Sequence, residues 1–144
     1  VVAAKQQIIS LALPSVMSHA LADGSELWRA DLMGGEVTPS PIFAGGLVIA
    51  VNPAGSLAAN RPDGAGDVTK SHVAWTVEES IPDVTSPVSD GEFVFAVTSS
   101  GNLAAFGVKD GKIVWQKGLE LEVQSSPVIA GKQLFVLGKN GDLI

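Results

Sequence analysis

The sequence has no cysteine and few basic residues, and these two shortages exclude several kinds of site. Without cysteine the chain has no disulfide scaffold, no thiolate metal site and no cysteine nucleophile, although this leaves its compartment open. Its nine Lys and Arg are scattered singly against fifteen Asp and Glu, so the net charge is −6 and no basic patch forms. Nucleic acid is therefore not an expected partner.

Long apolar runs are also missing. The longest extend over about six residues, whereas a membrane-spanning helix needs roughly 20. No transmembrane segment is expected, and no signal peptide is visible at the start, "VVAAKQQ". Helical periodicity never lasts the ten or so residues that a helix requires. Even so, 144 residues that are 46% hydrophobic are enough for one domain with a buried core.

The sequence repeats itself with a period of 40 to 47 residues. The tryptophans are 47 and 40 residues apart, and the Ser-Pro pairs and the glycines that open Gly-x-Leu are both 46 and 40 apart. Three independent markers in one register indicate a structural repeat. The markers are Trp28, Trp75 and Trp115, the Ser-Pro prolines Pro41, Pro87 and Pro127, and the glycines Gly55, Gly101 and Gly141.

Turn signals divide one repeat into four short segments, each of which is expected to be a strand of an antiparallel sheet. In the third copy the turns are Asp90-Gly91, Ser100-Gly101 and Asp110-Gly111. The repeats then fall at about 1–33, 36–78 and 82–118, with half a repeat at about 122–144. The second repeat has about six extra residues in "NRPDGAGDVTKS", which is the length of an enlarged loop.

The second strand of each repeat is apolar on both faces, as in "LVIAV", "EFVFAVT" and "LFVLG". A sheet with one wet face would alternate, so these strands need a neighbour above and below. Small sheets stacked around an axis form a β-propeller. The prolines suit an innermost edge strand, because proline cannot donate to a ladder. We therefore predict an all-β propeller of four-stranded antiparallel blades, with about three and a half blades present.

The residues around each tryptophan resemble the repeat of the pyrroloquinoline-quinone-like β-propellers. These residues are an Asp-Gly five positions before Trp, Gly-x-Leu-x-Ala before that, and Ser-Pro after it. The family includes the quinoprotein dehydrogenases and the outer-membrane assembly lipoproteins of the BamB type. The resemblance implies that Trp28, Trp75 and Trp115 pack between adjacent blades. Asn60 and Phe106 depart from the family, which often has Asp near their position.

Family rings usually have about eight blades. The resemblance therefore also implies that this chain is part of a larger ring, completed by other segments or by other copies.

The first functional hypothesis is a non-catalytic scaffold that binds protein partners through its loops and rims. The resemblance implies an extracytoplasmic bacterial setting, in the periplasm or cell envelope. Asp63, Gly64 and Asp67 in the enlarged loop are a candidate contact surface, because binding residues are often on loops over a rigid scaffold. Two carboxylates are too few for a proper calcium loop, so a solvated turn is the expected structure there.

The alternative is a fragment of a quinone-dependent oxidoreductase with its active site in blades outside this sequence. Family dehydrogenases stack the quinone on a tryptophan, use a carboxylate beside calcium and carry a vicinal disulfide. Here the tryptophans are at docking positions, cysteine is absent and no calcium motif stands out. No catalytic residue, metal site or cofactor is therefore predicted, and pyrroloquinoline quinone with calcium belongs to the alternative. A sensor domain joined to an effector is a third hypothesis.

Overall fold

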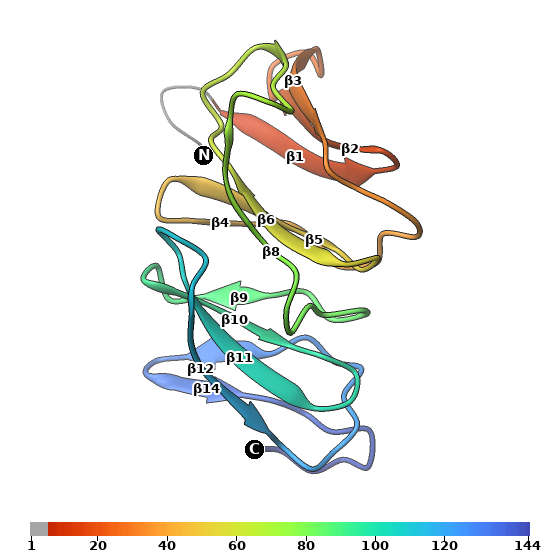
Figure 1. Cartoon of the computed structure of the whole chain (residues 1–144), viewed down its shortest axis with the longest axis vertical. Helices are drawn as coiled ribbons and strands as arrows, with labels where there is room; N and C mark the ends of the chain where they lie inside the picture. The colour runs from red at the N-terminus through yellow and green to blue at the C-terminus, as the bar shows by residue number, and fades with distance from the viewer. Residues whose placement is uncertain (1–5) are drawn as a thin grey trace.

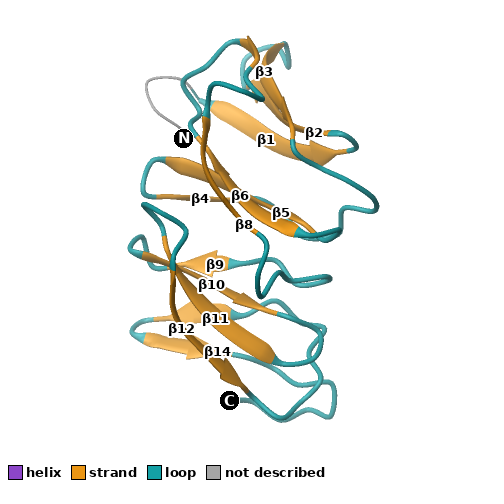
Figure 2. Cartoon of the chain, viewed as in Figure 1, coloured by secondary structure: helices purple, strands orange, loops and turns teal. Residues whose placement is uncertain are grey.

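The computed structural model describes residues 6–144, and all the regular structure in that range is β-strand. Three four-stranded sheets and one two-stranded sheet are stacked along the long axis of the molecule (Figure 1). Figure 2 shows these strands joined by loops and turns. The predicted all-β architecture of stacked four-stranded sheets is confirmed. Within residues 6–144, no helix combines the length and hydropathy needed to span a membrane.

The strands follow the repeat along the chain. The first sheet contains β1 (Gln7–Ala12), β2 (Ser15–Ala20), β3 (Glu26–Asp31) and β7 (Gly66–Asp67). The second contains β4 (Ile42–Ala44), β5 (Leu47–Asn52), β6 (Ser56–Asn60) and β8 (Val73–Val77). The third contains β9 (Val88–Ser89), β10 (Phe93–Val97), β11 (Asn102–Gly107) and β12 (Ile113–Gly118), and the last contains β13 (Val128–Ala130) and β14 (Gln133–Phe135). The innermost strand that the sequence predicts near residue 1 lies outside the described residues.

Glycine turns and a repeated bulge keep the sheets in one register. The predicted turn glycines of the third repeat have positive φ, at 99° for Gly91, 84° for Gly101 and 68° for Gly111. The Gly-x-Leu glycines of the other repeats do too, at 153° for Gly55 and 93° for Gly141. Pairing shifts once in each four-stranded sheet, at Ser18/His19, Ala59/Asn60 and Ala105/Phe106. A β-bulge at the same place in three sheets shows that the repeat in sequence is a repeat in structure.

The hydrophobic core lies between the sheets, which is why their strands are apolar on both faces. The boundary between the first and second sheets buries Trp28, Val48, Ala50 and Val68. The boundary between the second and third buries Ile49, Leu57, Trp75 and Phe106. Val97, Leu103, Val123 and Val136 form a smaller cluster between the third and last sheets. Neighbouring blades therefore stabilise one another face to face.

The prolines immediately precede the first strand of three sheets. Pro41 comes before β4, Pro87 before β9 and Pro127 before β13. β4 and β9 are end strands of their sheets, and β9 lies against both β4 and β13. The missing proline N–H therefore interrupts no ladder between two strands.

The enlarged loop of the second repeat adds a strand that the sequence did not predict. Gly66–Asp67 pairs in parallel with Trp28–Arg29, so β7 becomes the outer strand of the first sheet. The expected blades contained antiparallel pairs only. β7 belongs to the loop of the next blade and is not joined to β3 by a tight hairpin, so the two strands can pair in parallel.

Candidate functional site

Two tryptophans join adjacent blades by the same hydrogen bond. The Trp28 indole Nε1–H donates to the Pro62 carbonyl at 3.1 Å, and the Trp75 Nε1–H donates to the Val108 carbonyl at 2.9 Å. The two carbonyls are 46 residues apart, which is one repeat. The exposed fractions of the two residues are only 0% and 9%. Each ring therefore packs against the next blade and also satisfies a carbonyl of that blade.

Trp115 differs from the other two. It is 42% exposed, and its ring centroid is 6.1 Å from that of Phe95 in its own sheet. The repeat-equivalent carbonyl, 40 residues after Val108, is not among the 144 residues. Its docking against a further blade stays a prediction.

The Ser-Pro pairs contribute a second series of contacts between blades, through the serine. The Ser40 backbone N–H donates to the Ser86 hydroxyl at 2.8 Å, and the Ser86 N–H donates to the Ser126 hydroxyl at 2.9 Å. The sequence pattern predicted the role of the proline but not these hydrogen bonds. The signal was present, because a serine precedes the proline in every copy.

The enlarged loop is held by contacts with the first sheet and by hydrogen bonds within the loop. Val68 is buried, and its N–H donates to the Arg29 carbonyl at 2.8 Å. Asp67 accepts from the Thr69 hydroxyl at 2.7 Å and the Thr69 N–H at 3.0 Å, and these hydrogen bonds lower the Asp67 pKa. A Cβ on Gly64 would lie 2.5 Å from Val68 Cγ1, so only glycine fits there without a shift. Gly64 and Asp67 therefore hold the loop in place.

Asp63, the third candidate loop residue, is exposed. Its side chain is 67% exposed and lies 3.7 Å from His72 Nε2. Among residues 6–144, no three His, Cys, Asp or Glu side chains gather where they could hold a metal ion. A partner contact at this loop stays a prediction.

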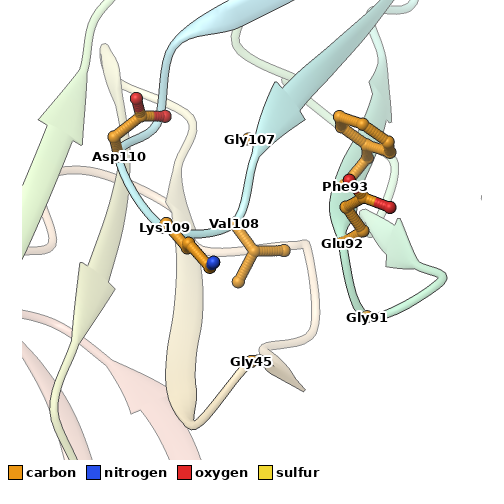
Figure 3. A pocket seen from close by; sticks show the side chains of 8 residues that line it. All are labelled: Gly45, Gly91, Glu92, Phe93, Gly107, Val108, Lys109 and Asp110. Atoms are coloured by element: carbon orange, nitrogen blue, oxygen red, sulfur yellow. The ribbon is translucent and has the colours of Figure 1, made fainter.

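The turns of the second and third sheets enclose a shallow depression of about 410 Å³. Gly45, Gly91–Phe93 and Gly107–Asp110, from three turns, line it. Figure 3 shows Val108 and Lys109 on one side, with Glu92 and Phe93 opposite. A Cβ on Gly45 would lie 2.5 Å from Val108 Cγ1, so glycine allows the two blades to approach this closely. The site has an apolar base and charged sides, which suits a side chain of a protein partner.

The charges around the depression come from short, fixed turns. The Asp110 carboxylate lies 3.3 Å from Lys112 Nζ, and the Lys112 backbone N–H donates to it at 3.2 Å. These contacts, led by the backbone hydrogen bond, lower the Asp110 pKa. Asp110 is therefore a fixed anion at neutral pH. The Asp-Gly turns could be predicted from the sequence, but the depression between them could not, because it forms only when two blades are docked.

Comparison with solved structures agrees with the propeller architecture. BamB from Moraxella catarrhalis superimposes with a TM-score of 0.76 at 14% identity, over 99% of this chain and 46% of that one. The computationally designed Ika4 protein superimposes with a TM-score of 0.70 at 15% identity, over 100% of this chain and 93% of that one. At these identities the likeness shows the fold.

Comparison with known sequences shows the family. Outer membrane protein assembly factor BamB of Vibrio cholerae is 33% identical over 127 residues, which are 76% of this chain and 31% of the relative. BamB of Shewanella oneidensis is 24% identical over 138 residues, 85% of this chain and 33% of the relative. The chain thus spans about a third of the length of these relatives. Residues 13–144 match the family model described as outer membrane protein assembly factor BamB, and the chain belongs to this family.

Proposed function

We propose that this chain is part of a propeller scaffold that serves outer membrane protein assembly by binding protein partners, without chemistry of its own. Support comes from the family match over residues 13–144 and from relatives named outer membrane protein assembly factor BamB. A role in outer membrane assembly places the scaffold in the bacterial cell envelope, on the periplasmic side.

The depression between the second and third sheets is the observation that carries this proposal. A hydrogen bond between the blades fixes one of the turns that line the depression, because the Trp75 indole donates to the Val108 carbonyl. Gly111 packs on the same indole, where a Cβ would lie 2.6 Å from Trp75 Cε3. Turns that are already ordered lose little freedom when a partner binds.

The lining suggests the chemistry of the partner. Phe93 offers apolar surface above the buried Val108, while Glu92 and Lys109 place opposite charges beside it. An apolar side chain can fill the depression while its neighbours pair with the two charges, as at the centre and rim of protein interfaces. The proposed site therefore recognises a folded protein surface or loop.

The scaffold role requires neither a quinone nor calcium. Pyrroloquinoline quinone and Ca²⁺ added to the purified protein should give no bound chromophore and no dye-reducing activity. A chromophore with such activity would favour the oxidoreductase alternative.

The proposal can be tested in a chimera that keeps the full length of a relative. The matching segment of Vibrio cholerae BamB is replaced by this chain, and the chimera is expressed in cells that lack their own BamB. We expect outer membrane protein levels to be restored. Lys109→Glu in the depression should lower them, whereas the matched change Lys132→Glu, at an exposed position in the turn between β13 and β14, should not. A folded chimera that restores nothing, or equal effects of the two changes, would contradict the proposal.

A further inference from the structure

One of the four asparagines stands directly before a glycine, in the pair Asn140-Gly141. The main-chain nitrogen that follows an asparagine can attack the side-chain carbonyl carbon, and glycine has no side chain to block the approach. The other three asparagines are followed by proline, which has no N–H, or by a residue with a large side chain. These pairs are Asn52-Pro53, Asn60-Arg61 and Asn102-Leu103. The sequence therefore makes Asn140 the most reactive asparagine of the chain.

Asn140 is also the asparagine that solvent reaches most freely. Asn140 and Gly141 are both exposed, at the tip of the turn of residues 138–142 that follows β14. Ala54 and Ser100 hold the equivalent place in the two preceding repeats, and both are exposed as well. The exposure therefore belongs to this position in the repeat.

The fold restrains two of the other asparagines. Asn60 is only 1% exposed. Asn102 is in β11, where its side-chain Nδ2 donates to the Ser80 hydroxyl at 3.0 Å. Among residues 6–144, Asn140 alone combines an exposed side chain with a following glycine.

Asparagine is chemically labile, and the reaction at this pair needs only water. The Gly141 nitrogen forms a bond to Asn140 Cγ, and the bond from Cγ to Nδ2 breaks. The Gly141 nitrogen gives its proton to water, while Nδ2 takes a proton from water and leaves as ammonia, so that a cyclic succinimide remains. Water then adds to one of the two ring carbonyl carbons and opens the ring. The product is aspartate, or isoaspartate in which the main chain passes through the former side-chain carbon.

The hydrogen bonds of the folded turn restrain this reaction. Asn140 Nδ2 donates to Asp142 Oδ2 at 2.7 Å, and the Asp142 N–H donates to Asn140 Oδ1 at 3.1 Å. The attacking nitrogen is also engaged, because the Gly141 N–H donates to the Gly138 carbonyl at 3.0 Å. The Asp142 carboxylate opposes the negative charge that the attack places on Oδ1. Opening of the turn removes these restraints and allows the reaction.

The product no longer fits the turn. A carboxylate at position 140 has no N–H to donate to Asp142, and it places two negative charges side by side. Isoaspartate also lengthens the main chain of the turn by one carbon atom. The turn contacts the preceding connection through the Lys139 N–H, which donates to the Glu122 carbonyl at 2.8 Å. The modification should therefore loosen both the turn and this contact.

We infer that Asn140-Gly141 is a site of spontaneous covalent modification, at which opening of the turn of residues 138–142 leads to conversion of Asn140 into aspartate and isoaspartate. The conversion is permanent, so a modified turn does not regain its original hydrogen bonds. This inference goes beyond the proposed scaffold function, because it concerns a chemical change at a turn outside the depression.

The test follows the mass of residue 140 over time. The 144-residue chain is incubated in neutral buffer, folded in one sample and unfolded by guanidinium chloride in another, and its peptides are analysed by mass spectrometry. Loss of the amide raises the mass, whereas isomerisation of Asp-Gly pairs does not, and fragmentation locates the change and identifies isoaspartate. We expect a mass gain at Asn140, several-fold faster in the unfolded chain. The rate should rise in mildly alkaline buffer, because the attacking nitrogen must lose a proton.

Three variants separate the effect of the turn from that of the dipeptide. Asp142→Ala removes the carboxylate that holds Nδ2, so it should speed the reaction several-fold in the folded chain and have little effect in the unfolded chain. Glu92→Ala, a change of an exposed acidic residue in another turn, should alter neither rate. Asn140→Ser, which introduces the residue of the preceding repeat, should abolish the mass gain in this peptide.

The inference is wrong if Asn140 gains no mass in the folded chain, if Asn60 or Asn102 reacts first, or if the folded and unfolded chains react at the same rate. Equal rates for folded Asp142→Ala and Glu92→Ala would also contradict it. The comparison of folded and unfolded wild-type chain remains decisive even if Asp142→Ala fails to fold. None of these results bears on the depression, so a failure here leaves the proposed scaffold function to its own test.

Discussion

Replacing Trp75 with alanine should destabilise the protein much more than the same change at Trp115. Trp75 is 9% exposed and donates to the Val108 carbonyl, whereas Trp115 is 42% exposed and packs on Phe95 of its own sheet. The two residues hold equivalent places in their repeats. The comparison therefore isolates the contribution of docking between blades.

The expected magnitudes follow from burial. A tryptophan buries about 150–250 Å², and Trp→Ala in a core typically costs about 3–5 kcal/mol. Trp75→Ala should be at the upper end of this range, because the buried Val108 carbonyl loses its donor. Trp115→Ala removes roughly two thirds as much buried surface and should cost about 2–3 kcal/mol.

The assay is urea unfolding followed by far-ultraviolet circular dichroism, which does not depend on the tryptophan removed. The free energy of unfolding comes from linear extrapolation for each variant. If the two variants lose the same free energy, Trp75 is not docked between blades as described. If Trp115→Ala loses more, the assignment of the blade boundaries is wrong.

Four further predictions concern single contacts and association. Gly111→Ala should lower the free energy of unfolding by about 2 kcal/mol or more, because Gly111 has a φ of 68° and the new Cβ would meet the Trp75 ring. Gly24 has a φ of 72° but open space around it, so Gly24→Ala should lower it by only about 1 kcal/mol. Urea unfolding measures both changes. Ser86→Ala should cost about 0.5–1 kcal/mol in the same assay, because the Ser40 N–H loses its acceptor. The hydrogen bond and the charge of Lys139 lower the Glu122 pKa. The pairing of these two side chains therefore stabilises the fold above the pKa of Glu122 in the unfolded state, and this stabilisation is lost as the pH falls through the lowered pKa of the folded state. Lys139→Ala should raise the Glu122 pKa in an NMR titration. The isolated 144-residue chain should self-associate in light scattering, because large apolar side chains are exposed in the last repeat.

Each of these predictions has a contradicting result. Equal costs for the two glycine variants would remove the argument from close approach to Trp75. An unchanged unfolding midpoint for Ser86→Ala would mean that this hydrogen bond adds no stability. An unshifted carboxyl titration would contradict the ion pair, and a monomer at high concentration would contradict the exposed apolar surface.

Much of the fold could be predicted because the repeat contains residues with strong preferences for turns or for buried strands. Gly111 marks a turn with positive φ, and β10 is apolar on both sides, so it requires a neighbour on each face. Trp28 and Trp75 lie in the hydrophobic clusters between the blades, a position that only the family resemblance had implied.

The parts that could not be predicted depend on contacts between repeats. β7 is only two residues long and pairs with a strand of another sheet, so no local periodicity marks it. The exposure of Trp115 depends on what covers it, although its local sequence matches the other copies. The depression around Val108 forms from turns of two blades, so no single segment contains its signal.

Hydrogen exchange of the three indole Nε1–H groups, followed by NMR, tests the central claim of blades docked through equivalent tryptophans most directly. The Trp28 and Trp75 indoles donate to carbonyls of the next blade and should exchange slowly. The Trp115 indole, in a side chain that is 42% exposed, should exchange rapidly. Rapid exchange of all three indoles would contradict the stacked-blade account.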